Sequence, residues 1–164
     1  MAAQRASLNT IEEFLAQKRI AMAGISRDPA NFSVKLFEEL CRRGYDVVPV
    51  NPNVAEVQGI RCFARVQDIQ PPVEAALLMT SPEATETVVN DCAAAGIRKI
   101  WMYRAVGKGA VSTKAVQFCQ GRGIEVVPGE CPFMFLPETA GFHRFHGFVR
   151  KITGSYPRRT SAMS

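Results

Sequence analysis

Residues suited to holding an anion recur where apolar runs of the sequence end. Gly24-Ile25-Ser26-Arg27 follows the first run, Asn51-Pro52 the second and Thr80-Ser81 the third. A glycine lets a phosphate approach the backbone, a hydroxyl donates a hydrogen bond, and a following helix offers N–H groups. Singly, each residue is also typical of an ordinary turn, but the set favours an anionic ligand. The cations that can neutralise phosphate charge are Arg27, Lys35, Arg104 and Lys108.

The motifs of two common phosphate ligands are absent. Gly24 has no further glycine after it until Gly44, so the dinucleotide fingerprint G-x-G-x-x-G is missing. The second apolar run ends at Asn51, where NAD-binding folds carry an acid for the ribose hydroxyls. The chain also lacks a Walker A loop. These absences disfavour NAD and ATP as ligands.

The apolar runs alternate with helical patterns along the chain. Continuous apolar runs are typical of strands buried on both faces, so we predict an α/β, Rossmann-like three-layer fold. Its sheet is mostly parallel, with five or six strands and helices on both faces. The predicted strands are 19–25, 45–50, 75–80, 99–103 and 124–127, with an edge strand near 60–63. The predicted helices are 10–18 (opened by a Thr10/Glu13 capping box), 33–43, 82–95, 112–120 and 142–152.

Length and charge limit the number of domains and the kinds of partner. The 164 residues suit one domain, predicted over 1–154 with both terminal helices, followed by a flexible basic tail at 155–164. The net charge is +5, but residues 1–138 hold as many acidic as basic groups, so the excess lies entirely after Glu138. A neutral domain with a basic end argues against nucleic acid as the partner. The aromatic stripe of 142–152 instead predicts a helix docked on the domain, a helix that binds a protein partner, or a helix that lies on a membrane surface.

No apolar run reaches the roughly 20 residues of a membrane span. The five cysteines are odd in number and form no C-x-x-C pair, which predicts reduced thiols and a cytoplasmic protein. Cys131 follows the last predicted strand and is a candidate reactive thiol. His143 and His146 share a helix face, and with Cys131 they are a candidate metal site. In each case a plain structural role is the competing interpretation.

The run Gly44-Tyr45-Asp46-Val47-Val48-Pro49-Val50-Asn51-Pro52 is the most specific piece of the sequence. With Gly24-Ile25-Ser26, Ile100-Trp101 and Cys131-Pro132, it resembles the CoA-binding-domain family of bacteria and archaea. That family is similar in fold to the CoA-binding domain of the succinyl-CoA synthetase alpha subunit. The resemblance covers roughly residues 18 to 135.

The resemblance implies a position for each part of coenzyme A. The pyrophosphate would lie at residues 24–27, bordered by Phe32, Ser33 and Lys35. The adenosine would rest near residues 51–52, and the pantetheine arm would pass residues 80–81. The sequence departs from the family pattern at Met102-Tyr103-Arg104, where many relatives are expected to carry a Gln after the aromatic residue of the fourth strand.

We therefore expect a protein that binds coenzyme A or an acyl-CoA without catalysis of its own. The phosphohistidine domain that the synthetase needs has no counterpart among these 164 residues. The alternatives are a small NAD(P)-dependent oxidoreductase and a CoA-thioester enzyme that uses Cys131. The predicted ligand site consists of Gly24, Ile25, Ser26, Arg27, Phe32, Ser33, Lys35, Asn51, Pro52, Thr80, Ser81 and Arg104.

Overall fold

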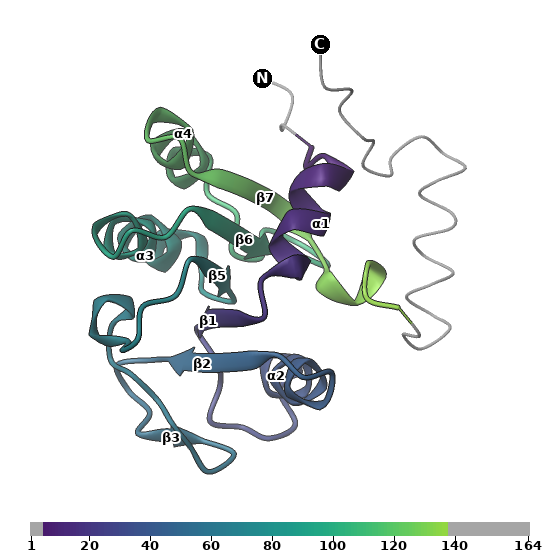
Figure 1. Cartoon of the computed structure of the whole chain (residues 1–164), viewed down its shortest axis with the longest axis vertical. Helices are drawn as coiled ribbons and strands as arrows, with labels where there is room; N and C mark the ends of the chain where they lie inside the picture. Colours follow the sequence, from purple (N-terminus) through teal and green to yellow (C-terminus); the bar gives the residue numbers. More distant parts are fainter. Residues whose placement is uncertain (1–4, 138–164) are drawn as a thin grey trace.

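A five-stranded parallel sheet forms the centre of the computed structural model, which describes residues 5–137 (Figure 1). The strands lie in the order β2-β1-β5-β6-β7, and every neighbouring pair is parallel. This confirms the predicted Rossmann-like α/β fold. The strands are β1 Arg19–Ala23, β2 Asp46–Val50, β5 Ala75–Leu78, β6 Lys99–Tyr103 and β7 Glu125–Glu130.

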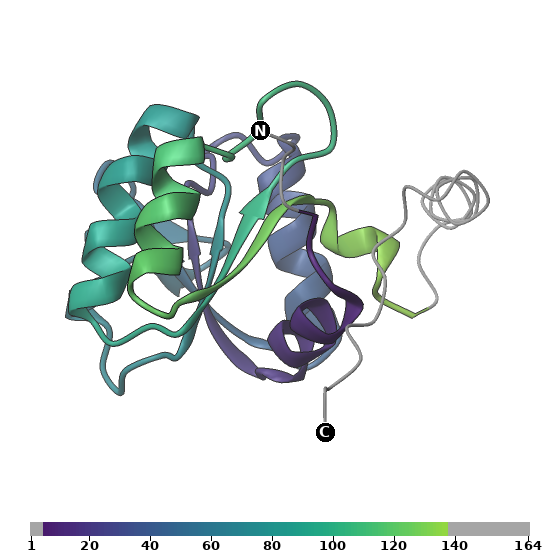
Figure 2. The same cartoon turned by 90° about the horizontal axis from the view of Figure 1, so that it is seen from above.

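Helices cover both faces of the sheet, with α1 and α2 on one side and α3 and α4 on the other (Figures 1 and 2). Alternate residues of each strand supply the two cores: Met22 and Trp101 face α1 and α2, whereas Ala23 and Met102 face α3 and α4. Both cores are therefore continuous layers. The helices are α1 Leu8–Ala16, α2 Phe32–Arg42, α3 Pro82–Ala94 and α4 Thr113–Gly121, with short 3-10 turns η1 Val66–Asp68 and η2 Pro132–Met134.

The predicted edge strand near residues 60–63 is split in two. Its first half is β4 (Ile60–Arg61), which pairs antiparallel with β3 (Glu56–Val57) around a turn in which Gln58 and Gly59 both have positive φ. Its last residue, Phe63, forms a single parallel bridge with Val50 of β2. A sixth strand is thus reduced to one bridge, because the chain turns back as a hairpin first.

Two helices begin earlier than predicted, because a different side chain caps each. Ser7 caps α1 by accepting a hydrogen bond from the Thr10 backbone N–H at 3.1 Å, so the expected cap lies inside the helix. Asn31 caps α2, whose predicted first residue, Ser33, is instead its second. Asparagine and serine are similarly good caps, so sequence alone does not choose between neighbours.

Strand β7 is longer than predicted and passes through Pro128. Among the described residues β7 pairs only with β6, and an edge strand tolerates a proline, whose nitrogen cannot donate a ladder bond. The Glu130 carbonyl accepts hydrogen bonds from Trp101 Nε1 at 2.8 Å and from the Arg104 backbone N–H at 3.3 Å. These bonds fix the end of β7 against the end of β6.

Some predictions fall outside the described residues: the helix at 142–152, the pair His143 and His146, and the tail at 155–164. All five cysteines lie within the described residues, and all are free thiols. No helix between residues 5 and 137 is long and apolar enough to cross a membrane.

Candidate functional site

The order of the strands reverses between β1 and β5. Helix α2 leads from β1 to β2 on one side, and α3 leads from β5 to β6 on the other. The loops after β1 and β5 therefore diverge at the carboxyl edge, which is where open parallel sheets bind their ligands. The predicted site residues that follow these strands lie at this edge.

Gly24 is the point where the two loops meet. Its φ is +84°, and its N–H donates to the Val50 carbonyl at 3.1 Å. A Cβ on Gly24 would lie 2.8 Å from the Met79 carbonyl carbon and 2.9 Å from the Thr80 nitrogen. The glycine is thus required by the close approach of two backbones, independently of any ligand.

A small hydrogen-bond network fixes the loop between β1 and α2. The Ser26 backbone N–H donates to Ser33 Oγ at 3.0 Å, and Ser33 Oγ donates to Asn31 Oδ1 at 2.8 Å. Asn31 Oδ1 also accepts from the Ser33 backbone N–H at 2.9 Å. Ser33 is only 3% exposed. Ser33 therefore shapes the loop from beneath, and the Ser26 N–H is already bonded.

Asn51 links the loops that follow β1 and β2. Its Nδ2 donates to the Ile25 carbonyl at 2.9 Å, and its Oδ1 accepts from the Asn53 backbone N–H at 2.9 Å. The Ile25 side chain is fully buried in the core beside α2. Asn51 and Ile25 accordingly position the walls of the site, and the Ile25 side chain is turned away from it.

A hollow of about 340 Å³ opens beside this loop. Its walls come from the start of the β1–α2 connection, from the first turn of α2, and from the stretch after β2 that enters the β3–β4 hairpin. Of the predicted site residues, Ser26 and Arg27 line it. Its full lining is Ser26, Arg27, Pro29, Val34, Asn53, Val54, Ala55, Glu56, Val57 and Gln58.

The wall at residues 53–58 was missed by the sequence analysis. The available signal was Gln58-Gly59, a pair suited to a tight hairpin turn, but the segment around it is irregular in composition. The hairpin places Glu56 in the hollow. A carboxylate therefore lines the hollow, contributed by the hairpin and not by the end of β2 at Asn51.

The predicted residues after β5 lie at the same edge but do not line this hollow. Thr80 Oγ1 is 2.7 Å from Thr85 Oγ1, and Ser81 caps α3 by accepting from the Ala84 N–H at 3.3 Å. Both hydroxyls thus have partners within the protein. Pro52 and Lys35 are exposed to solvent and are also outside the lining.

Arg104 lies at the end of β6, against β7. A Cβ on Gly129 would come within 2.7 Å of Arg104 Nη2, so the guanidinium packs directly over that glycine. No residue between 5 and 137 forms an ion pair with Arg104. The structure therefore does not place Arg104 in the hollow with Ser26 and Arg27.

An aromatic cluster stands between α2, β6 and η2. The Phe32 ring stacks on Tyr103 with centroids 5.3 Å apart, and it meets Phe133 edge-on at 5.5 Å. Burial raises the pKa of Tyr103 to about 12, with a smaller contribution from Cys131. Phe32, a predicted site residue, is thus part of a packed aromatic cluster. The ring on which it stacks belongs to Tyr103, one of the residues at which the sequence departs from the family pattern.

Cys131 is 3% exposed at the start of η2. Burial is the main cause that raises the pKa of its thiol to about 11, with a smaller contribution from the nearby Glu130. A thiol with such a pKa is almost fully protonated at neutral pH and is a poor nucleophile. Among residues 5–137, no cluster of three metal-ligating side chains occurs.

Comparisons with known proteins agree with this architecture. The chain is 26% identical over 129 residues to YneT, an uncharacterized protein of Bacillus subtilis, covering 78% of this chain and 93% of YneT. It is 26% identical over 91 residues to the alpha subunit of ADP-forming acetate–CoA ligase II of Pyrococcus furiosus. That match covers 55% of this chain but only 20% of the ligase subunit.

A solved structure of a hypothetical protein from Pyrococcus horikoshii OT3 superimposes with a TM-score of 0.70 at 26% identity. The match covers 79% of this chain and 93% of that protein. The model of the CoA binding domain family matches residues 18–137, which include every strand of the sheet and the whole hollow. The chain therefore belongs to the CoA binding domain family.

Proposed function

We propose that this protein binds coenzyme A, free or acylated, at the carboxyl edge of its sheet, with the adenosine end in the hollow beside Ser26 and Arg27. The observation that carries the proposal is the location of that hollow. It is lined in part by the loop after β1, one of the two loops that diverge at the carboxyl edge, in a chain that the CoA-binding family model matches from residue 18 to 137.

The chemistry of the lining supports this assignment. Arg27 supplies a cation suited to a phosphate, and Val34, Val54 and Val57 supply apolar surface suited to a base. A volume of about 340 Å³ is in the lower range of small-molecule sites. The pantetheine arm would then run along the edge toward the ends of β5 and β6, past Thr80 and Ser81.

We further propose that the protein has no catalytic centre of its own, so that it holds CoA for sensing, storage or delivery. The CoA-thioester alternative needs an activated nucleophile near the thioester. Burial of Cys131 raises its pKa to about 11, which argues against that role. A direct test is to incubate the protein with CoA, succinate and ATP or GTP. Enzyme-dependent formation of succinyl-CoA would contradict the proposal.

A nicotinamide dinucleotide remains the second candidate ligand, because Glu56 lines the hollow. Carboxylates near the end of the second strand hold the ribose hydroxyls of NAD in dinucleotide-binding folds. Native mass spectrometry of the purified protein separates the candidates, since CoA and NAD differ in mass. We expect a CoA adduct after incubation with both compounds, and a predominant NAD adduct would reverse the assignment.

A further inference from the structure

Two opposite charges face the same hollow from different walls. Arg27 comes from the connection after β1, and Glu56 is the first residue of β3 in the hairpin after β2. Among the described residues that line the hollow, they are the only charged ones. Both are exposed, and within residues 5–137 neither forms an ion pair, with the other or with any third residue. Both charged groups are therefore available to a ligand.

We propose that Glu56 is a specificity-determining residue that sets how strongly the site prefers a ribose carrying a phosphate over a ribose with free hydroxyls. This inference rests on the proposed function, because it takes the adenosine end of the ligand to lie in the hollow. The ribose of CoA carries a 3′-phosphate beside a free 2′-hydroxyl, whereas the ribose of dephospho-CoA carries two free hydroxyls.

The two side chains prefer opposite ligands. The Arg27 guanidinium presents a fork of N–H donors that matches phosphate oxygens. The Glu56 carboxylate only accepts hydrogen bonds, so it suits a hydroxyl and repels a phosphate. Arg27 therefore raises the affinity for CoA relative to dephospho-CoA, and Glu56 lowers that ratio.

The local structure makes Glu56 a selective element and not a structural one. Its strand is two residues long, and the backbone of β3 pairs with β4, so the fold of the hairpin does not depend on the Glu56 side chain. The turn at Gln58 and Gly59, both with positive φ, fixes which residues of the hairpin face the hollow. Replacing the carboxylate should thus change binding without unfolding the site.

The test is isothermal titration calorimetry of the full-length protein with CoA and with dephospho-CoA, for wild type, Glu56→Gln and Arg27→Gln. We expect Glu56→Gln to tighten CoA several-fold and to weaken dephospho-CoA, so that the ratio of the two affinities changes on the order of tenfold. Arg27→Gln should move the same ratio in the opposite direction.

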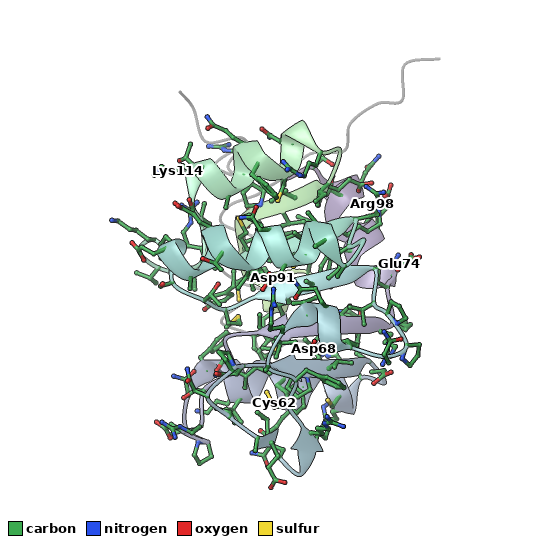
Figure 3. All side chains as sticks on the ribbon, turned by 90° about the vertical axis from the view of Figure 1, so that its left-hand side faces the viewer. Cys62, Asp68, Glu74, Asp91, Arg98 and Lys114 are labelled. Atoms are coloured by element: carbon green, nitrogen blue, oxygen red, sulfur yellow. The ribbon has the colours of Figure 1, made fainter. Side chains whose placement is uncertain are left out.

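Glu74→Gln is the matched control. Figure 3 shows Glu74 at the end of the molecule opposite Lys114, which belongs to the start of α4, and Glu74 is exposed and outside the hollow. This variant should bind both ligands as wild type does. If wild type binds CoA but Glu56→Gln leaves the ratio unchanged, the role of Glu56 is refuted. If wild type binds neither ligand, the proposed function itself fails, and this inference fails with it.

Discussion

Replacing Gly24 by alanine tests whether the two loops at the carboxyl edge must meet at a residue without a side chain. Gly24 has φ +84°, and alanine in the left-handed region costs about 1–2 kcal/mol. Its Cβ would also lie 2.8–2.9 Å from the backbone of Met79 and Thr80, and overpacking of this kind costs about 1–3 kcal/mol. The free energy of unfolding should therefore fall by about 2–5 kcal/mol.

Gly44→Ala is the control for backbone conformation alone. Gly44 has φ +86°, yet nothing lies within 4 Å of the position its Cβ would take. This variant should lose only about 1–2 kcal/mol. The difference between the two variants, about 1–3 kcal/mol, isolates the contact between the loops.

Urea denaturation of both variants measures these free energies, and thermal melts should show the same order. For a domain of this size, each kcal/mol corresponds to about 2–4 °C in melting temperature. Gly24→Ala should also bind CoA more weakly, because the loop after β1 must shift, whereas Gly44→Ala should bind as wild type does. Equal losses of stability in the two variants would refute the claim that Gly24 is required by the Met79–Thr80 backbone.

Two further predictions concern buried groups. Ser33→Ala removes a hydroxyl that accepts a hydrogen bond from the Ser26 N–H and donates one to Asn31 Oδ1. Urea titrations should therefore show a free energy of unfolding lower by about 1–3 kcal/mol. An unchanged value would mean that the network contributes nothing to folding. Burial raises the pKa of Cys119 and Cys131 from 9.0 to about 11, so the folded protein keeps protons that the unfolded chain releases. The contribution of these two protonated thiols to stability should be complete below pH 9 and lost as the pH rises to about 11. The double variant Cys119→Ser, Cys131→Ser should flatten this part of the pH–stability curve. A curve equally steep in the double variant would assign the alkaline loss to other groups.

The parallel sheet could be predicted because its strands are continuous apolar runs. Runs such as Ala75–Leu78 leave little choice but burial on both faces, and the helices between them follow from periodicity and end at glycines. The exact helix starts could not be predicted, because Ser7 competes with Thr10 and Asn31 with Ser33. In both pairs the two side chains are similarly good caps, so residue type does not decide which one reaches the free N–H groups.

The site was predicted less completely than the fold. Ser26 and Arg27 were predicted to hold the pyrophosphate of CoA, and both line the hollow. Asn51 and Ser33 stabilise the loops through hydrogen bonds, a role that residue type alone does not distinguish from ligand binding. The wall with Glu56 was missed, because two-residue strands leave almost no periodic signal and their position depends on how the hairpin folds back.

The measurement that tests the central claim most directly is a thermal and calorimetric titration of the intact protein with CoA, dephospho-CoA and NAD. We predict affinities in the order CoA, dephospho-CoA, NAD. CoA at about 100 times its dissociation constant should add about 2.7 kcal/mol to stability, or roughly 5–10 °C in melting temperature.

Ser26→Leu should abolish this CoA-dependent rise, because a leucine side chain would project into the hollow where Ser26 lines it. Its own melt without ligand provides the baseline, since the bond from the Asp28 N–H to Ser26 Oγ is lost as well. A rise with CoA in wild type that disappears in Ser26→Leu is the result we predict. A shift with NAD as large as that with CoA, or a full response of Ser26→Leu to CoA, would contradict the assignment of a CoA site to this edge of the sheet.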